Sequence, residues 1–125
     1  MNIKPRIVLF SLQTSETDNK EFQPYVENLL SEYGFKRLIG SYKGSLEQSY
    51  LVVASEDKAL YLVLGLARKF NQESVLIVDE ERKATLKYIG SGETVKLGQF
   101  VSVSAIEAQG LENWTLDGTN YYSVR

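Results

Sequence analysis

The chain of 125 residues contains no cysteine and no histidine. The absence of cysteine excludes disulfides and thiolate metal sites, and it suits a reducing compartment such as the cytoplasm. The absence of histidine removes the commonest general base and the commonest transition-metal ligand. Any catalysis must therefore use carboxylates, lysines, tyrosines or hydroxyl groups, and we predict neither a metal nor another cofactor.

Proline, glycine and net charge are also low. Two prolines and nine glycines are too few for a linker or a low-complexity segment, so we expect one domain over residues 1–125. The net charge of −2 gives no general attraction to nucleic acid or to anionic lipid, and we expect neither partner. The longest apolar stretch, residues 59–67, is about half the length of a membrane span.

Apolar periodicity predicts the elements of the first two thirds of the chain. Four short segments are rich in β-branched and aromatic residues, and two longer segments place apolar residues on one helical face. The strands are expected at residues 7–10, 35–42, 46–54 and 74–78, and the helices at residues 22–33 and 55–70. This β-α-β-β-α-β order is that of the split βαβ motif. We therefore predict an α+β fold with a ferredoxin-like core over about residues 7–78.

The segment of about residues 84–125 differs from this core. Ser104 and Glu107 form a capping-box pattern, which predicts a short helix that ends at Gly110. Asp117-Gly118 between two strand-like segments predicts a β-hairpin. We expect this part of the chain to be an extension of β-strands and one short helix that is added to the core.

The second predicted helix has more apolar surface than one contact can bury. Residues 60–67 are apolar all round the helix, and a single stripe is enough to cover a sheet. Tyr61, Leu62 and Leu66 then need another cover. Either the C-terminal extension packs on them, or they form an interface with a partner, which includes the option of a homo-oligomer.

The most informative polar segment is residues 42–49. Strand alternation places Glu47 and Ser49 on one face, and Tyr42 lies near them if the strands pair through the turn at residues 43–45. A second polar group follows the second helix. Together the candidate ligand-binding or partner-binding residues are Tyr42, Lys43, Gly44, Glu47, Ser49, Gln72, Glu73 and Ser74. The alternative is a structural cluster whose polar groups only bond one another and the backbone.

Two segments carry a family resemblance. Residues 40–49 fit a YKGxxExS pattern, and residues 66–76 fit an LARxFxQESVL pattern. In these segments the chain resembles a family of small proteins, without an assigned activity, found in bacteria and especially in tailed phages. The resemblance implies a phage origin and a role inside the host cytoplasm, and it implies no mechanism.

These observations lead to one main prediction of function and two alternatives. We predict a small, non-enzymatic, phage-encoded binding protein that engages a host protein or another host macromolecule, or sequesters a small ligand. The first alternative is a structural or accessory protein of the virion that acts through self-association. The second is a small enzyme with Glu47 as general base, which a pocket around Glu47 and a raised pKa of its carboxyl would favour.

Overall fold

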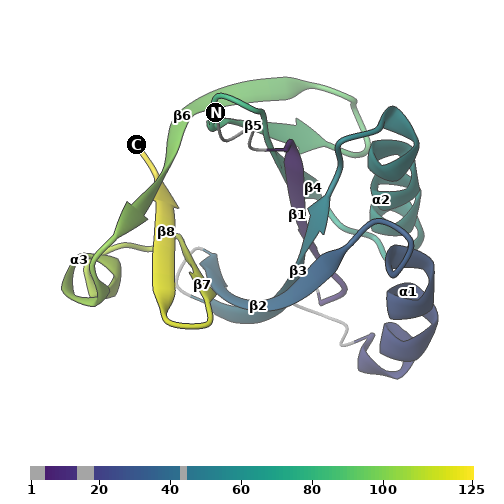
Figure 1. Ribbon diagram of the computed structural model, residues 1–125, viewed down its shortest axis with the longest axis horizontal. Coiled ribbons are helices and arrows are strands. Elements are labelled where there is room, and N and C mark those ends of the chain that lie inside the picture. The colour runs from purple at the N-terminus through teal and green to yellow at the C-terminus, as the bar shows by residue number, and fades with distance from the viewer. Residues whose placement is uncertain (1–4, 14–18, 43–44) are drawn as a thin grey trace.

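The fold is a closed barrel of eight antiparallel strands, seen end-on in Figure 1. A computed structural model describes residues 5–13, 19–42 and 45–125. Around the barrel the strands follow the order β1-β3-β2-β7-β8-β6-β5-β4, and β4 pairs with β1 to close the ring. The strands are β1 (Ile7–Ser11), β2 (Phe35–Tyr42), β3 (Ser45–Val53), β4 (Ser74–Val78), β5 (Lys83–Tyr88), β6 (Thr94–Val103), β7 (Trp114–Asp117) and β8 (Asn120–Val124).

The helices lie outside the barrel. A 3-10 turn, η1 (Lys20–Phe22), leads into α1 (Gln23–Leu30), and this helix packs with α2 (Asp57–Lys69) on one side of the barrel (Figure 1). The short helix α3 (Ala105–Gln109) lies beside β8 and has the predicted capping box. In the described part of the chain, no helix is long and apolar enough to cross a bilayer.

The prediction of a ferredoxin-like α+β fold is wrong. The strands and helices of the first two thirds form close to their predicted positions, and four of the strands are neighbours in the order β4-β1-β3-β2. However, β2 also pairs with β7 and β4 also pairs with β5, so the sheet has no free edge. The C-terminal segment is therefore half of the barrel wall rather than an extension. Closure satisfies backbone groups that an open edge would expose.

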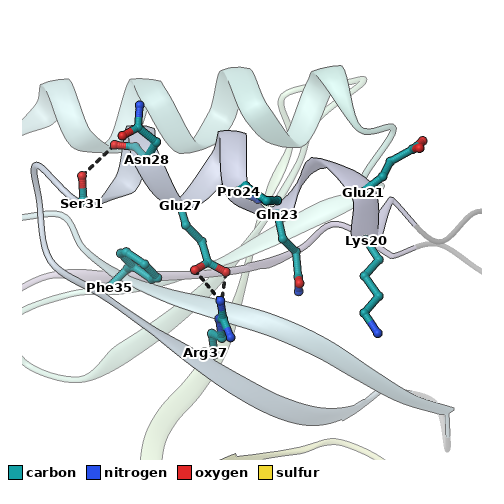
Figure 2. A pocket seen from close by; sticks show the side chains of 9 residues that line it. All are labelled: Lys20, Glu21, Gln23, Pro24, Glu27, Asn28, Ser31, Phe35 and Arg37. Atoms are coloured by element: carbon teal, nitrogen blue, oxygen red, sulfur yellow. Dashed lines mark hydrogen bonds and ion pairs between the residues drawn. The ribbon is translucent and has the colours of Figure 1, made fainter.

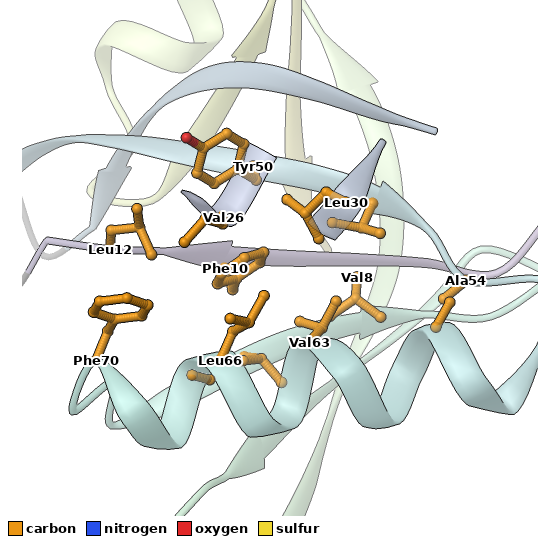
Figure 3. Close-up of a cluster of buried hydrophobic side chains, with 14 of the residues drawn as sticks. Val8, Phe10, Leu12, Val26, Leu30, Tyr50, Ala54, Val63, Leu66 and Phe70 are labelled. Atoms are coloured by element: carbon orange, nitrogen blue, oxygen red, sulfur yellow. The ribbon is translucent and has the colours of Figure 1, made fainter. Parts of the chain in front are cut away.

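The larger hydrophobic core lies between the two longer helices and the outer face of the barrel (Figure 3). Strand alternation points Val8 and Phe10 of β1 toward α2, where Val63 and Leu66 face them. Leu30 of α1 closes the same cluster and is fully buried. The helices thus cover one outer side of the barrel with a dry, packed layer.

The core also decides which side chains of α2 are covered. Leu66 is buried in this cluster, and Leu62 packs against it in part, whereas 67% of Tyr61 is exposed. The C-terminal segment contributes Ile89 to the cluster, and α1 supplies Val26 and Leu30. Of the three residues predicted to form an interface, Leu66 is therefore unavailable to a partner, and an interface at Tyr61 stays a prediction.

A smaller cluster fills part of the barrel interior. Its buried members come from inward-facing positions of four strands, and partly buried side chains pack against them from β6 and β8. The buried members are Ile7, Leu9, Leu38, Val78 and Ala84. This cluster occupies only part of the interior, and the rest is hollow.

Candidate functional site

The barrel encloses a cavity of about 1170 Å³ that is partly open to solvent, and all eight strands contribute to its wall. This volume is above the range of about 300–1000 Å³ that is typical of small-molecule sites. The wall carries both polar and apolar side chains. Its polar side chains include Ser11, Gln13, Glu47, Ser49, Gln72 and Ser74, and its apolar ones include Leu9, Leu76, Leu86, Phe100 and Val124. Such a mixed wall offers both hydrogen-bonding groups and apolar surface to a small molecule.

Glu47 is the half-buried carboxylate of this wall. It lies on β3 directly opposite Gly40 of β2, and it faces the interior. Burial raises the pKa of the Glu47 carboxyl above its ordinary value, because the ionised form loses hydration. Among the residues that the structure describes, none donates a hydrogen bond to this carboxylate or forms an ion pair with it. A cation that enters the cavity would therefore recover part of the lost solvation.

The structure brings six of the eight predicted site residues to this one cavity. Tyr42, Ser49, Gln72, Glu73 and Ser74 line it together with Glu47, whereas Lys43 and Gly44 lie outside the described residues. Two segments that are distant in the sequence thus line one cavity. Whether these side chains bind a ligand stays a prediction.

Gln72 shows that part of this cluster has a structural role. Its side-chain Nε2 donates to the backbone carbonyl of Gln13 at 3.0 Å. Its backbone N–H donates to the carbonyl of Ala67 at 2.8 Å, which closes the C-terminal turn of α2. The structural alternative therefore holds for Gln72, although the same residue lines the cavity.

The residues that the sequence did not point to come from the C-terminal half. Phe100, Thr115 and Tyr122 line the same cavity from β6, β7 and β8. The hairpin signal at Asp117-Gly118 correctly located β7 and β8, but it carries no information on which other strand they meet. Closure of the barrel places Thr115 opposite Gly40, and thereby brings this hairpin to the Glu47 side of the cavity.

A second hollow lies outside the barrel, between α1 and β2 (Figure 2). Here the Glu27 carboxylate accepts two hydrogen bonds from Arg37, at 2.8 and 2.7 Å, and one from the Tyr50 hydroxyl at 2.8 Å. Hydrogen bonding to Arg37 lowers the pKa of Glu27. Because its carboxylate is satisfied, we interpret this network as a clamp between α1 and the sheet. Residues 5–13, 19–42 and 45–125 contain no cluster of three or more acidic side chains arranged to hold a metal ion.

The fold defines a small antiparallel β-barrel protein, and its strands enclose an internal cavity. The family model of the S-adenosylmethionine lyase family matches residues 10–125, so the chain belongs to this family. No curated protein matches the chain.

Family membership corrects the main functional prediction. The family is one of enzymes, so the prediction of a non-enzymatic binding protein is wrong, and the alternative of a small enzyme is closer. The match carries no information on a phage origin, which stays a prediction.

Proposed function

We propose that the chain cleaves a carbon–sulfur bond of S-adenosylmethionine without the use of water, inside the barrel cavity. The proposal is supported by membership of the S-adenosylmethionine lyase family. The observation that carries it is the half-buried Glu47 carboxylate, which has no cationic partner among the described residues and lines a cavity large enough for this substrate. A desolvated anion is a suitable binding group for a cationic metabolite.

The chemistry of the reaction decides which positive charge Glu47 should meet. The substrate carries a sulfonium and an α-ammonium group. The sulfonium loses its charge as the C–S bond breaks, so a carboxylate held against it would stabilise the substrate more than the transition state. The ammonium keeps its charge throughout. We therefore assign the ammonium group to Glu47 and the sulfonium to the less polar part of the cavity.

The residues of this chain favour a route without proton transfer. The substrate's own carboxylate can attack the carbon that carries the sulfur: a C–O bond forms, the C–S bond breaks, and its electron pair moves to sulfur. The products are a five-membered lactone and 5′-methylthioadenosine, and no proton is added or removed. The protein then needs to hold the substrate folded for attack, which is catalysis by proximity. A chain without histidine or cysteine can do this.

The test is product analysis with purified protein and S-adenosylmethionine in ¹⁸O-labelled water. The expected products are 5′-methylthioadenosine and an initially unlabelled lactone. Glu47→Gln should lower kcat/KM about 10- to 100-fold, the usual worth of a hydrogen bond to a charged group. Glu32→Gln, an exposed change of the same charge, should leave it unaltered. The absence of 5′-methylthioadenosine would contradict the function. An unsaturated amino acid in place of the lactone would contradict the route and indicate an elimination that requires a base.

Location and partners belong to the same proposal. We propose that the partner is a small ligand, S-adenosylmethionine, and that the enzyme acts in the cytoplasm, which its lack of cysteine suits. A homo-oligomer stays a prediction, to be checked by light scattering of the purified protein.

A further inference from the structure

Phe100 and Tyr122 form a stacked aromatic pair in the cavity wall. Their ring centroids are 5.1 Å apart, and the ring planes differ by 7°. Both side chains line the cavity, from the neighbouring strands β6 and β8. We propose that this pair binds the adenine ring of the substrate and so sets the direction in which the substrate lies. The inference rests on the proposed function, since it takes S-adenosylmethionine as the ligand.

The strand register connects this pair with Glu47. Glu47 lies opposite Gly40, Gly40 opposite Thr115, and Thr115 opposite Tyr122. These four positions form one row across the barrel wall. Three steps between neighbouring strands measure about 14 Å along the curved wall, and the two ends of the row lie closer than this across the interior. A ligand with an ammonium at one end and a purine at the other can follow this curved row, with the ammonium at Glu47 and the purine at Tyr122.

The two middle positions of the row are small. Gly40 has no side chain, and a Cβ placed there would lie 3.4 Å from the carbonyl oxygen of Trp114 and 4.0 Å from Oγ1 of Thr115. A glycine inside a strand weakens the strand and often marks the close approach of a ligand. We therefore assign the space over Gly40 and Thr115 to the ribose and the sulfonium, with no carboxylate of the row directly beneath the sulfur.

The surroundings of the pair suit a neutral base better than the charged amino-acid end. Phe100 lies opposite Val124, and both pack against the apolar cluster inside the barrel. Because the two rings stack on each other, an outer ring face is the surface that remains for a ligand. Purines stack on such faces, and the charged groups of the substrate would lose hydration there.

The experiment measures the affinity of 5′-methylthioadenosine, which contains the adenosyl group and lacks the ammonium. By titration calorimetry, Tyr122→Leu and Phe100→Leu should each weaken binding about 5- to 100-fold, as expected for the loss of one base–aromatic contact. The matched control is Tyr121→Leu, which changes the same residue type on the opposite face of β8 and should bind as the unmodified protein does. Unaltered affinity in folded Tyr122→Leu and Phe100→Leu would overturn the inference.

A measurement on the unmodified protein guards against variants that fail to fold. Nuclear Overhauser effects from the adenine H2 and H8 protons to the Tyr122 or Phe100 ring protons are expected, and contacts to other aromatic residues only would overturn the inference. The result is separable from the proposed function. If the protein cleaves S-adenosylmethionine and the aromatic variants bind normally, the function stands and the inference fails. If no cleavage occurs and these variants lose binding, the inference stands alone.

Discussion

The outer and inner faces of the same strands have opposite characters. On β1, Val8 and Phe10 face outward into a packed core under α1 and α2, whereas Leu9 and Ser11 face inward and line the cavity. The outer face is sealed and apolar, and the inner face is hollow and carries a carboxylate without a partner among the described residues. We infer from this difference that the outer core contributes most of the stability of the fold. The inner face can then enclose a cavity in place of a packed core.

The largest difference in stability is expected between two leucine substitutions, one in the outer core and one in the cavity wall. Leu66→Ala removes a side chain that is 4% exposed in the outer core, and it should lower the free energy of unfolding by about 2–5 kcal/mol. Leu76→Ala alters the cavity wall, where part of the space is already unfilled, and it should cost clearly less. Urea denaturation of both variants tests the comparison, and equal losses would contradict it.

Closure of the barrel should be sensitive to one glycine of β6. Gly98 has a φ of +122°, and a Cβ there would lie 2.2 Å from the backbone oxygen of Arg125. Gly98→Ala should therefore destabilise the protein by about 1–3 kcal/mol. Gly90→Ala, which meets no atom within 4 Å, is the matched control and should be close to neutral. Thermal unfolding that is the same for both variants would show that this contact does not matter.

Local signals predicted the elements, and they could not predict how the edges meet. The residue periodicity located β1 to β4 and both long helices, and the capping box of Ser104 and Glu107 located α3. An open sheet and a closed barrel share these local patterns, because closure depends on pairings such as Gly40 with Thr115 between distant segments.

The same limit applies to the candidate site. Alternation within β3 placed Glu47 and Ser49 on one face, which strand pairing then turned inward. Nothing local connects these residues with Phe100 or Tyr122, since their proximity follows only from the register of β2, β7 and β8. The sequence thus predicted the polar half of the cavity and missed the aromatic half.

A polar group of the outer face should stabilise the fold. Tyr50→Phe removes the hydrogen bond from its hydroxyl to Glu27 and should cost about 1 kcal/mol in the free energy of unfolding. Burial raises the pKa of the Tyr50 hydroxyl, so it stays a donor at neutral pH. Chemical denaturation of this variant at pH 7 provides the measurement. An unaltered midpoint would contradict the interpretation of the Glu27 network as a clamp.

Glu47, a polar group of the inner face, should lower the stability of the fold, and this effect should be the smallest of those predicted. Burial raises the pKa of Glu47, so the ionised carboxylate costs stability at every pH above its ordinary pKa of 4.5. Glu47→Gln should therefore unfold at a slightly higher temperature than the unmodified protein at pH 7. The difference should shrink as the pH falls through the raised pKa and vanish below 4.5. A lower melting temperature at pH 7 would identify Glu47 as a structural residue.

The most direct test of the central claim compares two ligands that differ in the ammonium-bearing chain. Titration calorimetry at pH 7 measures the affinities of S-adenosylhomocysteine and 5′-methylthioadenosine for the unmodified protein and for Glu47→Gln. If Glu47 holds the ammonium inside the barrel, the variant should lose about 10- to 100-fold in affinity for S-adenosylhomocysteine and keep its affinity for 5′-methylthioadenosine. Equal affinities of the two proteins for both ligands, or an equal loss for both, would contradict the account.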